Sequence, residues 1–299
     1  MRLRWNMTRL SSWLFSAIAI AAIVAMAGLL VIESVPVWKH EGASFLTGTR
    51  WFFRQGEFGA APMIYGSVAV ALIALVLAAP LALGAAVFSA EYLPRRARLA
   101  LKVTIELLAG VPSVVYGLLG ILLLRDWIYQ VLERFDPLSG DTLLTAGVLL
   151  AVMILPTIMT LADDALRAVP GAQRVAARGL GMTSTEAVLH VSLPQAAPGL
   201  LAAMLLGLGR ALGETIAVFL VVGRQDNQWP ESLASLRPLM EAGQTLTSKL
   251  GGSETNIAYG QPLHWAAITG LGLLLLGLVL VVTLVGVWLQ RLAGKHHHV

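Results

Sequence analysis

The chain has 299 residues, of which 57% are hydrophobic and only 13% are charged, and its mean hydropathy is +0.76. Soluble domains carry about 25% charged residues, so this composition indicates a membrane protein. The lack of cysteine excludes disulfide frameworks, thiolate metal sites and cysteine nucleophiles. The net charge is +4, but in so apolar a chain the distribution of Lys and Arg along the sequence matters more than their sum. We expect these residues to set the orientation of the chain in a membrane rather than to bind nucleic acid.

Six runs of about 18 or more mostly apolar residues are long enough to cross a hydrocarbon core of roughly 30 Å. These predicted spans are 13–32, 63–88, 103–124, 143–161, 198–222 and 264–289. We therefore expect an all-α polytopic membrane protein. An N-terminal segment with the first span and an outer loop covers 1–62, the main transmembrane domain covers 63–290, and a cytoplasmic tail covers 291–299. The loops 162–197 and 223–262 are too long to be simple connections.

Six spans place both termini on one side of the membrane. The segments on that side hold 12 of the 21 Lys and Arg residues, so the positive-inside tendency predicts that both termini are cytoplasmic. The basic start and the small residues Ala25, Met26 and Ala27 also resemble a secretory signal with its cleavage site. We favour a retained span, because the apolar run continues to Ile32.

The third predicted span contains Gly110 and Pro112, and proline leaves a backbone carbonyl without its helical donor. A kink is therefore expected there. Ser113 and Tyr116 lie directly after it and are candidates to line a translocation path, although such a kink is more often simple geometry.

The cytoplasmic loop predicts two short helices. Residues 173–180 are rich in Ala, Arg and Leu, and Gly181 ends that helix. Thr183 or Ser184 can cap a second helix, with Glu186 in its first turn, that extends as far as Pro194. Such an element could dock onto a soluble partner, or it could lie as an amphipathic hairpin on the membrane surface.

Arg210 and Glu214 lie about halfway along the fifth predicted span, where ionisable residues are costly and usually mark a pathway. Four residues apart in one helix, they would share a face. The guanidinium fork suits a tetrahedral oxyanion, and Glu214 would hold Arg210 when no substrate is bound. The alternative is a permanent ion pair that joins helices. Gly207, Gly209 and Gly213 would allow close approach of a helix or a ligand.

The cytoplasmic loop also carries a spacing that resembles the coupling motif of membrane subunits in ABC importers. The motif comprises Val175-Ala176-Ala177, then Gly181, then Val191-Ser192-Leu193-Pro194. The resemblance implies that Ala176, Ala177, Gly181, Leu193 and Pro194 belong to an element that inserts into a cleft of the ATPase. Val175 stands where that family usually has Glu, so a salt bridge from that position to the ATPase is not expected.

Four further blocks resemble the phosphate-importer permeases, specifically their PstC-type subunit. They are GEFGA at 56–60, EYLP at 91–94, ELLAGVPSVVYG at 106–117 and GLGRALGET at 207–215. The resemblance implies a type I ABC importer permease fold (MetI-like) in the bacterial inner membrane. It also implies a role for Arg210 and Glu214 in phosphate transport. The partners it implies are a second, PstA-type permease, a PstB-type ATPase dimer, a PstS-type phosphate-binding protein and membrane lipid.

Enzyme motifs are absent from the sequence: there is no Gly-rich Lys-Ser/Thr loop, no His-Glu-x-x-His pair and no Gly-x-Ser-x-Gly elbow. We expect no enzymatic activity and no bound cofactor or metal, with ATP and Mg²⁺ used by the partner ATPase. Two alternatives remain: a permease for molybdate, sulfate or phosphonate, and a stand-alone secondary transporter. The run His296-His297-His298 is expected to be a flexible tail or a remnant of a tag rather than a metal site.

Overall fold

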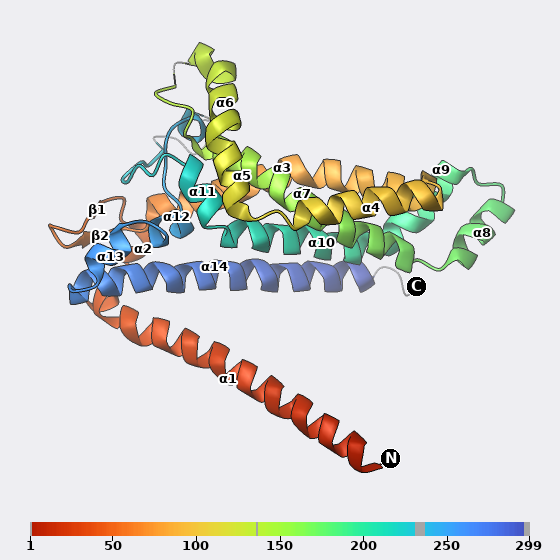
Figure 1. Ribbon diagram of the computed structural model, residues 1–299, viewed down its shortest axis with the longest axis horizontal. Helices are drawn as coiled ribbons and strands as arrows, with labels where there is room; N and C mark the ends of the chain where they lie inside the picture. The colour runs from red at the N-terminus through yellow and green to blue at the C-terminus, as the bar shows by residue number, and fades with distance from the viewer. Residues whose placement is uncertain (1, 136, 231–236, 296–299) are drawn as a thin grey trace.

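The computed structural model describes residues 2–135, 137–230 and 237–295, and the terminal histidine run lies outside this part of the chain. Helices dominate it, and the single two-stranded hairpin pairs Trp51 with Phe58 and Phe52 with Glu57. Long helices run roughly side by side, with small elements at both ends of the bundle (Figure 1). The long helices are α1 (Arg2–Glu41), α3 (Ala61–Val87), α4 (Arg95–Ala109), α7 (Leu143–Ala168), α10 (Leu193–Gly213) and α14 (Pro262–Lys295).

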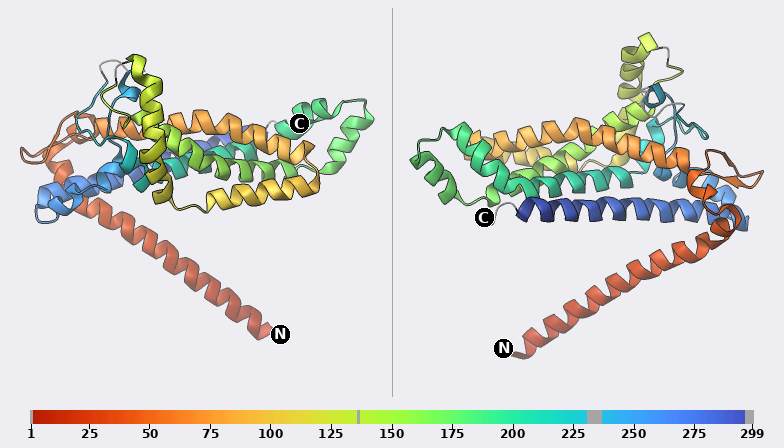
Figure 2. Two further views of the ribbon diagram at one scale, coloured as in Figure 1. Left: turned by 45° about the horizontal axis from the view of Figure 1, so that its top comes forward. Right: turned by 180° about the vertical axis from the view of Figure 1, so that it is seen from behind.

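Shorter elements connect and extend them. They are α2 (Ser44–Thr47), β1 (Trp51–Phe52), β2 (Glu57–Phe58), η1 (Phe88–Tyr92), α5 (Ser113–Leu119), η2 (Gly120–Leu124), α6 (Arg125–Leu132), η3 (Glu133–Phe135), α8 (Gly171–Gly179), α9 (Ser184–Ala187), η4 (Val188–Ser192), α11 (Ile216–Val221), η5 (Arg237–Met240), α12 (Leu246–Leu250) and α13 (Glu254–Ala258). The helices α8 and α9 occupy one end of the bundle, and the hairpin, α12 and α13 occupy the other (Figures 1 and 2).

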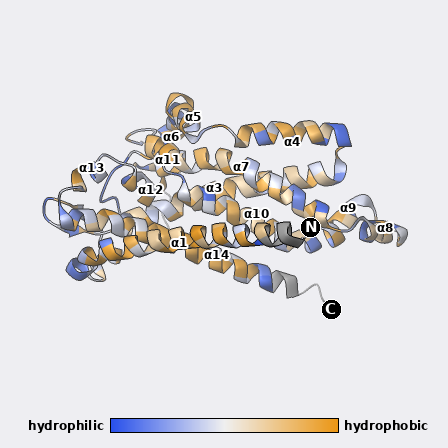
Figure 3. Cartoon of the chain, turned by 60° about the horizontal axis from the view of Figure 1, so that its bottom comes forward, coloured by the Kyte–Doolittle hydropathy of each residue, from blue (hydrophilic) through white to orange (hydrophobic). Residues whose placement is uncertain are grey.

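Six helical stretches in the described part are long and apolar enough to cross a membrane, as the sequence predicted. They are Arg9–Glu41, Ala61–Tyr92, Ser113–Phe135, Leu143–Ala168, Ser184–Gly213 and Pro262–Arg291. Hydrophobic residues follow the long helices, whereas many hydrophilic ones gather near their ends (Figure 3). The N-terminal end of α1 and the C-terminal end of α14 both point toward the end that carries α8 and α9 (Figures 1 and 2). An even number of spans requires this arrangement.

The core of the bundle forms around α7, which packs against α3, α10, α4 and α11. The alanines of α3 recur every three or four residues on the face that meets this core, and each is at most 2% exposed. They are Ala71, Ala74, Ala78, Ala82 and Ala86. Small side chains let two helices approach closely, which matters in lipid because hydrophobic burial drives little helix association there. Gly147 of α7 serves the same purpose, since an added Cβ would lie 2.5 Å from Ile73.

The helix α1 differs from the rest, because it packs against α14 near its C-terminal end and diverges from the bundle toward its N-terminus (Figure 1). Its buried residues, Ser34 and Val37, lie in that last part. The helix runs unbroken past Ala27 to Glu41, so cleavage after Ala27 would cut it in the middle.

Two predicted spans differ from the structure. The third is interrupted between Ala109 and Ser113, where the kink was predicted, but its predicted bounds of 103–124 were wrong. The membrane-length stretch begins after the break and covers Ser113–Phe135, whereas α4 runs beside α7 before the break. The fifth was predicted to run unbroken over 198–222, and this was wrong. Its helix begins earlier and ends at Gly213, where Glu214 adopts an extended conformation before α11 begins at Ile216.

Candidate translocation site and coupling helices

Arg210 lies in the last turn of α10 and is half-buried. Its Nη1 donates a 2.7 Å hydrogen bond to Thr157 Oγ1, which is near the middle of α7. Because α7 crosses the whole bundle, Arg210 lies at a depth far from either end. Across residues 2–135, 137–230 and 237–295, no carboxylate oxygen approaches its guanidinium within 4 Å. A single neutral hydroxyl therefore holds this cation.

Glu214 does not pair with Arg210, and the expectation that both residues share one helix face was wrong. The helix ends between them, and Glu214 Oε1 instead accepts a long bond of 3.4 Å from the backbone N–H of Ala217. The carboxylate thus lies at the start of α11, where unpaired N–H groups and the helix dipole favour a negative charge. The break separates the two charges that a continuous helix would have stacked.

The three glycines around Arg210 differ in their surroundings. An added Cβ at Gly207 would lie 2.5 Å from Ile158 Cγ1, so close packing of α10 on α7 requires this glycine. At Gly209 and Gly213, an added Cβ would meet no atom within 4 Å. The side of α10 that carries these two glycines is therefore open in the isolated chain, directly beside Arg210.

Tyr116 is buried and bridges the break between α4 and α5. Its hydroxyl donates a 2.8 Å bond to the carbonyl of Leu108, the group that would have accepted from residue 112 in a continuous helix. Pro112 has no N–H to donate, so the tyrosine hydroxyl takes its place. This contact gives Tyr116 a structural role, while Ser113, half-buried at the first turn of α5, makes no such bridge. In the described part of the chain, the hydrogen bonds of Tyr116 and Arg210 go to Leu108 and Thr157, and neither Ser113 nor Tyr116 is hydrogen-bonded to Arg210.

The predicted helix pair at the other end is present as α8 and α9. Gly181 between them has φ +91°, a conformation that favours glycine. Thr183 and Glu186 form a complete capping box: Thr183 Oγ1 accepts from the Glu186 N–H, and the Glu186 carboxylate accepts from the Thr183 N–H at 2.8 Å.

The coupling residues lie on α8, in the turn after it and at the start of α10, and some of the apolar side chains near them are exposed. Ala177 is buried, whereas Ala176 is exposed, as are Val175 and Leu180 at 68% and 83%. The second helix was expected to end at Pro194, and this was wrong. The π-helical turn η4 leads directly into α10, with Leu193 and Pro194 at its first positions, where a missing N–H costs little.

A polar cluster at the opposite end of the bundle was not predicted, and we call it the outer cluster: Trp51, Asp226, Lys249, Glu254 and His264. Lys249 is 2% exposed, and its Nζ lies 2.6 Å from Asp226 Oδ2 and 2.5 Å from Glu254 Oε2. Glu254 Oε1 also accepts from Trp51 Nε1 at 2.6 Å and contacts His264 Nε2 at 2.9 Å. The cluster joins β1 and the loop after α11 to three neighbouring helices, α12, α13 and α14.

The outer cluster changes the titration of Glu254. Burial acts to raise the pKa of this carboxyl, but hydrogen bonds from Lys249, Trp51 and His264, with the charge of Lys249, outweigh burial and leave the pKa below its ordinary value. A polar pocket of about 260 Å³ adjoins the cluster, and both Arg224 and Asp226 line it. Through the ion pair of Asp226 with Lys249, the outer cluster holds the loop that follows α11 against α12.

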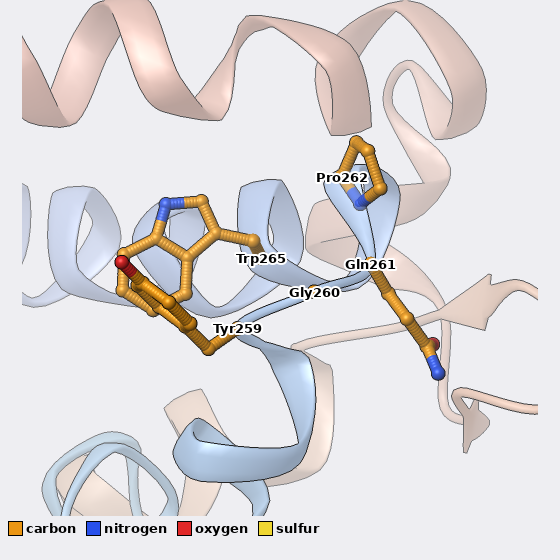
Figure 4. Close-up of a pocket in the computed structure, with 5 residues that line it drawn as sticks. All are labelled: Tyr259, Gly260, Gln261, Pro262 and Trp265. Carbon is orange, nitrogen blue, oxygen red and sulfur yellow. The ribbon is translucent and has the colours of Figure 1, made fainter.

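A second pocket at this end, of about 280 Å³, is lined by Tyr259, Gly260, Gln261, Pro262 and Trp265 (Figure 4). The rings of Tyr259 and Trp265 meet edge to face, 5.5 Å apart. No charged side chain lines this pocket, so its chemistry does not suit an anion.

Comparisons with known proteins agree with this architecture. Residues 78–296 match the family described as binding-protein-dependent transport system inner membrane component. The phosphate transport system permease protein PstC 1 of Mycobacterium tuberculosis is 34% identical over 273 residues, which cover 81% of this chain and 80% of the relative. The phosphate transport system permease protein PstC of Haemophilus influenzae is 35% identical, over 88% of this chain and 85% of the relative.

Solved structures show the same fold at lower sequence identity. An inward-facing form of the MetNI methionine ABC transporter aligns with a TM-score of 0.58 and 20% identity, over 77% of this chain and 94% of that chain. This likeness confirms the type I ABC importer permease fold. The chain belongs to the binding-protein-dependent transport system inner membrane component family and is a multi-pass permease subunit of an ABC importer.

Proposed function

We propose that this chain is the PstC-type permease subunit of an importer that carries inorganic phosphate into the cell. The relatives that support this substrate are phosphate transport permeases by name and cover most of the chain. The other oxyanions considered above, molybdate, sulfate and phosphonate, share part of the chemistry but have no such support here.

The observation that carries the proposal is the unneutralised guanidinium of Arg210. A half-buried cation at this depth without a carboxylate partner is costly, so an arriving anion gains interaction energy at this position. The planar fork of donors matches the oxygens of a tetrahedral phosphate. Thr157 offers a single neutral acceptor, which phosphate can displace at lower cost than a carboxylate. In this mechanism Thr157 orients Arg210 between transport cycles.

In this mechanism Glu214 is not a counter-ion of Arg210 and does not compete with phosphate for its guanidinium. Its carboxylate lies at the N-terminal end of α11, away from the guanidinium, and leaves the anion position beside Arg210 free. The open side of α10 at Gly209 and Gly213 gives phosphate and a second permease room to approach. Ser113 remains a candidate to line the path at the start of α5, and Tyr116 supports the break before it.

The proposed complex contains a PstA-type second permease, a PstB-type ATPase dimer below α8 and α9, and a PstS-type binding protein at the opposite end. Both termini and the coupling helices face the cytoplasm of a bacterial cell with this chain in its inner membrane, in keeping with the excess of Lys and Arg on that side. ATP and Mg²⁺ act in the ATPase. The motion of its subunits reaches this chain through Ala176, Ala177 and Gly181.

Uptake by Arg210→Gln tests the proposal. Proteoliposomes that hold the complete complex should lose at least about tenfold of their phosphate uptake, because removal of a charge-assisted contact costs about 1.5–3 kcal/mol. Arg95→Gln removes an equal charge from an exposed position on α4 and serves as the control. Normal uptake by an assembled Arg210→Gln complex would contradict the role of Arg210. Wild-type uptake of molybdate or sulfate in place of phosphate would contradict the substrate.

A further inference from the structure

A second arginine, Arg174, holds the coupling helix α8 against the transmembrane helices. Unlike its neighbour Val175, this side chain turns inward and is 18% exposed. Its Nη2 donates a 2.6 Å bond to the carbonyl of Leu166, and its Nε donates a 3.1 Å bond to Ser192 Oγ. Nη2 also lies 3.0 Å from Glu91 Oε1. One guanidinium thus joins α8 to three other elements.

Each of the three contacts supports a buried or helix-terminal group. Leu166 lies in the last turn of α7, where the helix dipole favours positive charge, and its carbonyl also accepts a longer bond of 3.3 Å from the Val169 N–H. The Glu91 side chain is only 9% exposed, and Arg174 is its sole ion-pair partner within 4 Å in the described part of the chain. Glu91 Oε1 makes no well-aligned hydrogen bond, so the charge of Arg174 is what compensates it. Ser192 is fully buried in η4.

The remaining attachment of α8 is slight. Ala177 is its one buried residue, and the helix lies beyond the end of the bundle, next to α9 (Figure 1). The short connection Val169–Pro170 ties its start to α7, and Val169 packs in the apolar core of the bundle. The pair between Arg174 and Glu91 is therefore the direct polar link from α8 to the end of α3, through η1.

We propose that Arg174 is a positioning residue, which converts displacement of α8 into joint movement of the cytoplasmic ends of α3, α7 and α10. This inference rests on the proposed function, since it assumes that a partner ATPase moves α8. The ion pair between Arg174 and Glu91 is short and largely buried, so it transmits displacement better than a solvent-exposed pair would. Loss of the link leaves α8 able to dock and move, with its motion poorly transmitted.

The first test follows α8 alone and does not depend on transport. Hydrogen exchange of the α8 amides in detergent should accelerate about tenfold in Arg174→Gln, because three contacts are lost. Arg96→Gln, an exposed arginine at the same end of the bundle, is the control and should match wild type. Exchange of the Arg174→Gln α8 amides at the wild-type rate would overturn the inference.

The second test measures coupling in proteoliposomes with the complete complex, as ATP hydrolysed per anion imported. We expect Arg174→Gln and Glu91→Gln to assemble and hydrolyse ATP, with this ratio raised at least about fivefold. The double variant should be no worse than Arg174→Gln, because both changes remove one interaction. A ratio within twofold of Arg96→Gln would overturn the inference, and so would additive effects or failure of both single variants to assemble.

These readouts separate the inference from the proposed function. The ratio applies to whichever oxyanion the wild-type complex imports, so transport of an anion other than phosphate would refute the substrate and leave the role of Arg174 open to measurement. If the wild-type complex imports no anion, the proposed function fails, and the exchange experiment still decides whether Arg174 anchors α8.

Discussion

Lys249→Met should loosen the outer cluster, because Lys249 is a buried cation in α12 that holds two carboxylates. Methionine keeps the length and volume of the lysine stem, so the change removes the charge and opens little space. The variant leaves Asp226 and Glu254 without the ammonium that lies 2.6 Å and 2.5 Å from them. It also ends the contact of this cation with the Trp51 ring, 5.1 Å away.

The magnitude follows from what the carboxylates retain. Removal of one partner from a buried ion pair costs about 3–5 kcal/mol. Glu254 keeps its bonds to Trp51 and His264, and the Asp226 side chain is 32% exposed, so the lower end applies. A cost of about 3 kcal/mol corresponds to a change of about 150-fold in a local opening equilibrium.

Hydrogen exchange measured on the detergent-solubilised chain reports this opening. The informative amides are those of α12, for example the Lys249 N–H, which bonds to the Thr245 carbonyl at 3.0 Å, and the Leu246 N–H, which bonds to Ser67 Oγ at 2.8 Å. Their exchange should accelerate about 100-fold in Lys249→Met if local opening governs it.

Lys102→Met is the matched control. Lys102 pairs with Asp164 at 3.2 Å, but the two side chains are 32% and 55% exposed, so loss of this pair costs at most about 1 kcal/mol. It should leave α12 unchanged. If Lys249→Met changed exchange at α12 by less than about threefold, or no more than Lys102→Met did, the energetic role of the outer cluster would be refuted.

Two other predictions concern single contacts. Tyr116→Phe should lower the melting temperature in detergent by the equivalent of about 0.5–1.5 kcal/mol, because it removes the 2.8 Å bond to the Leu108 carbonyl and leaves that carbonyl the longer 3.3 Å bond from the Val111 N–H. Tyr129→Phe, at an exposed tyrosine, should leave the melting temperature unchanged, and equal melting of the two variants would contradict the bridge. Since the pKa of Glu254 is lowered in the folded chain, its stabilising effect is complete above its ordinary pKa of 4.5 and is lost as pH falls through the lower folded value. The difference in melting temperature between wild type and Glu254→Gln should therefore shrink below about pH 4, and a difference that grew would have the wrong sign.

Several features follow from sequence because they depend on local chemistry. Span length and apolar composition predict the six membrane-crossing helices, since a hydrocarbon core demands both. Pro112 predicts the break in the third span through its missing N–H, and Thr183 with Glu186 predicts a helix start through capping. These effects act within a few residues of their cause, so no knowledge of distant segments is needed.

The charged pair shows where local reasoning fails. A spacing of four residues places Arg210 and Glu214 on one face only if the helix continues, and it ends at Gly213. Glycine is common at helix ends, but Gly207 and Gly209 lie inside the same helix, so Gly213 alone did not mark the end. In the structure Arg210 donates a hydrogen bond to Thr157, 53 residues earlier in the chain, and Glu214 accepts one at the start of α11. Which neighbour a polar side chain finds depends on how α10 packs on α7.

The sequence by itself determined the fold class, the number of spans, the coupling motif and Arg210 as the candidate cation for an oxyanion. Only the tertiary structure decided the partners of the charged groups: Thr157 for Arg210, Glu91 for Arg174, and two carboxylates for Lys249. The physical reason is that a buried charge needs compensation, but any segment that packs beside it can supply the compensating group. Composition and spacing show which charges must be compensated, and helix packing determines which residue compensates each of them.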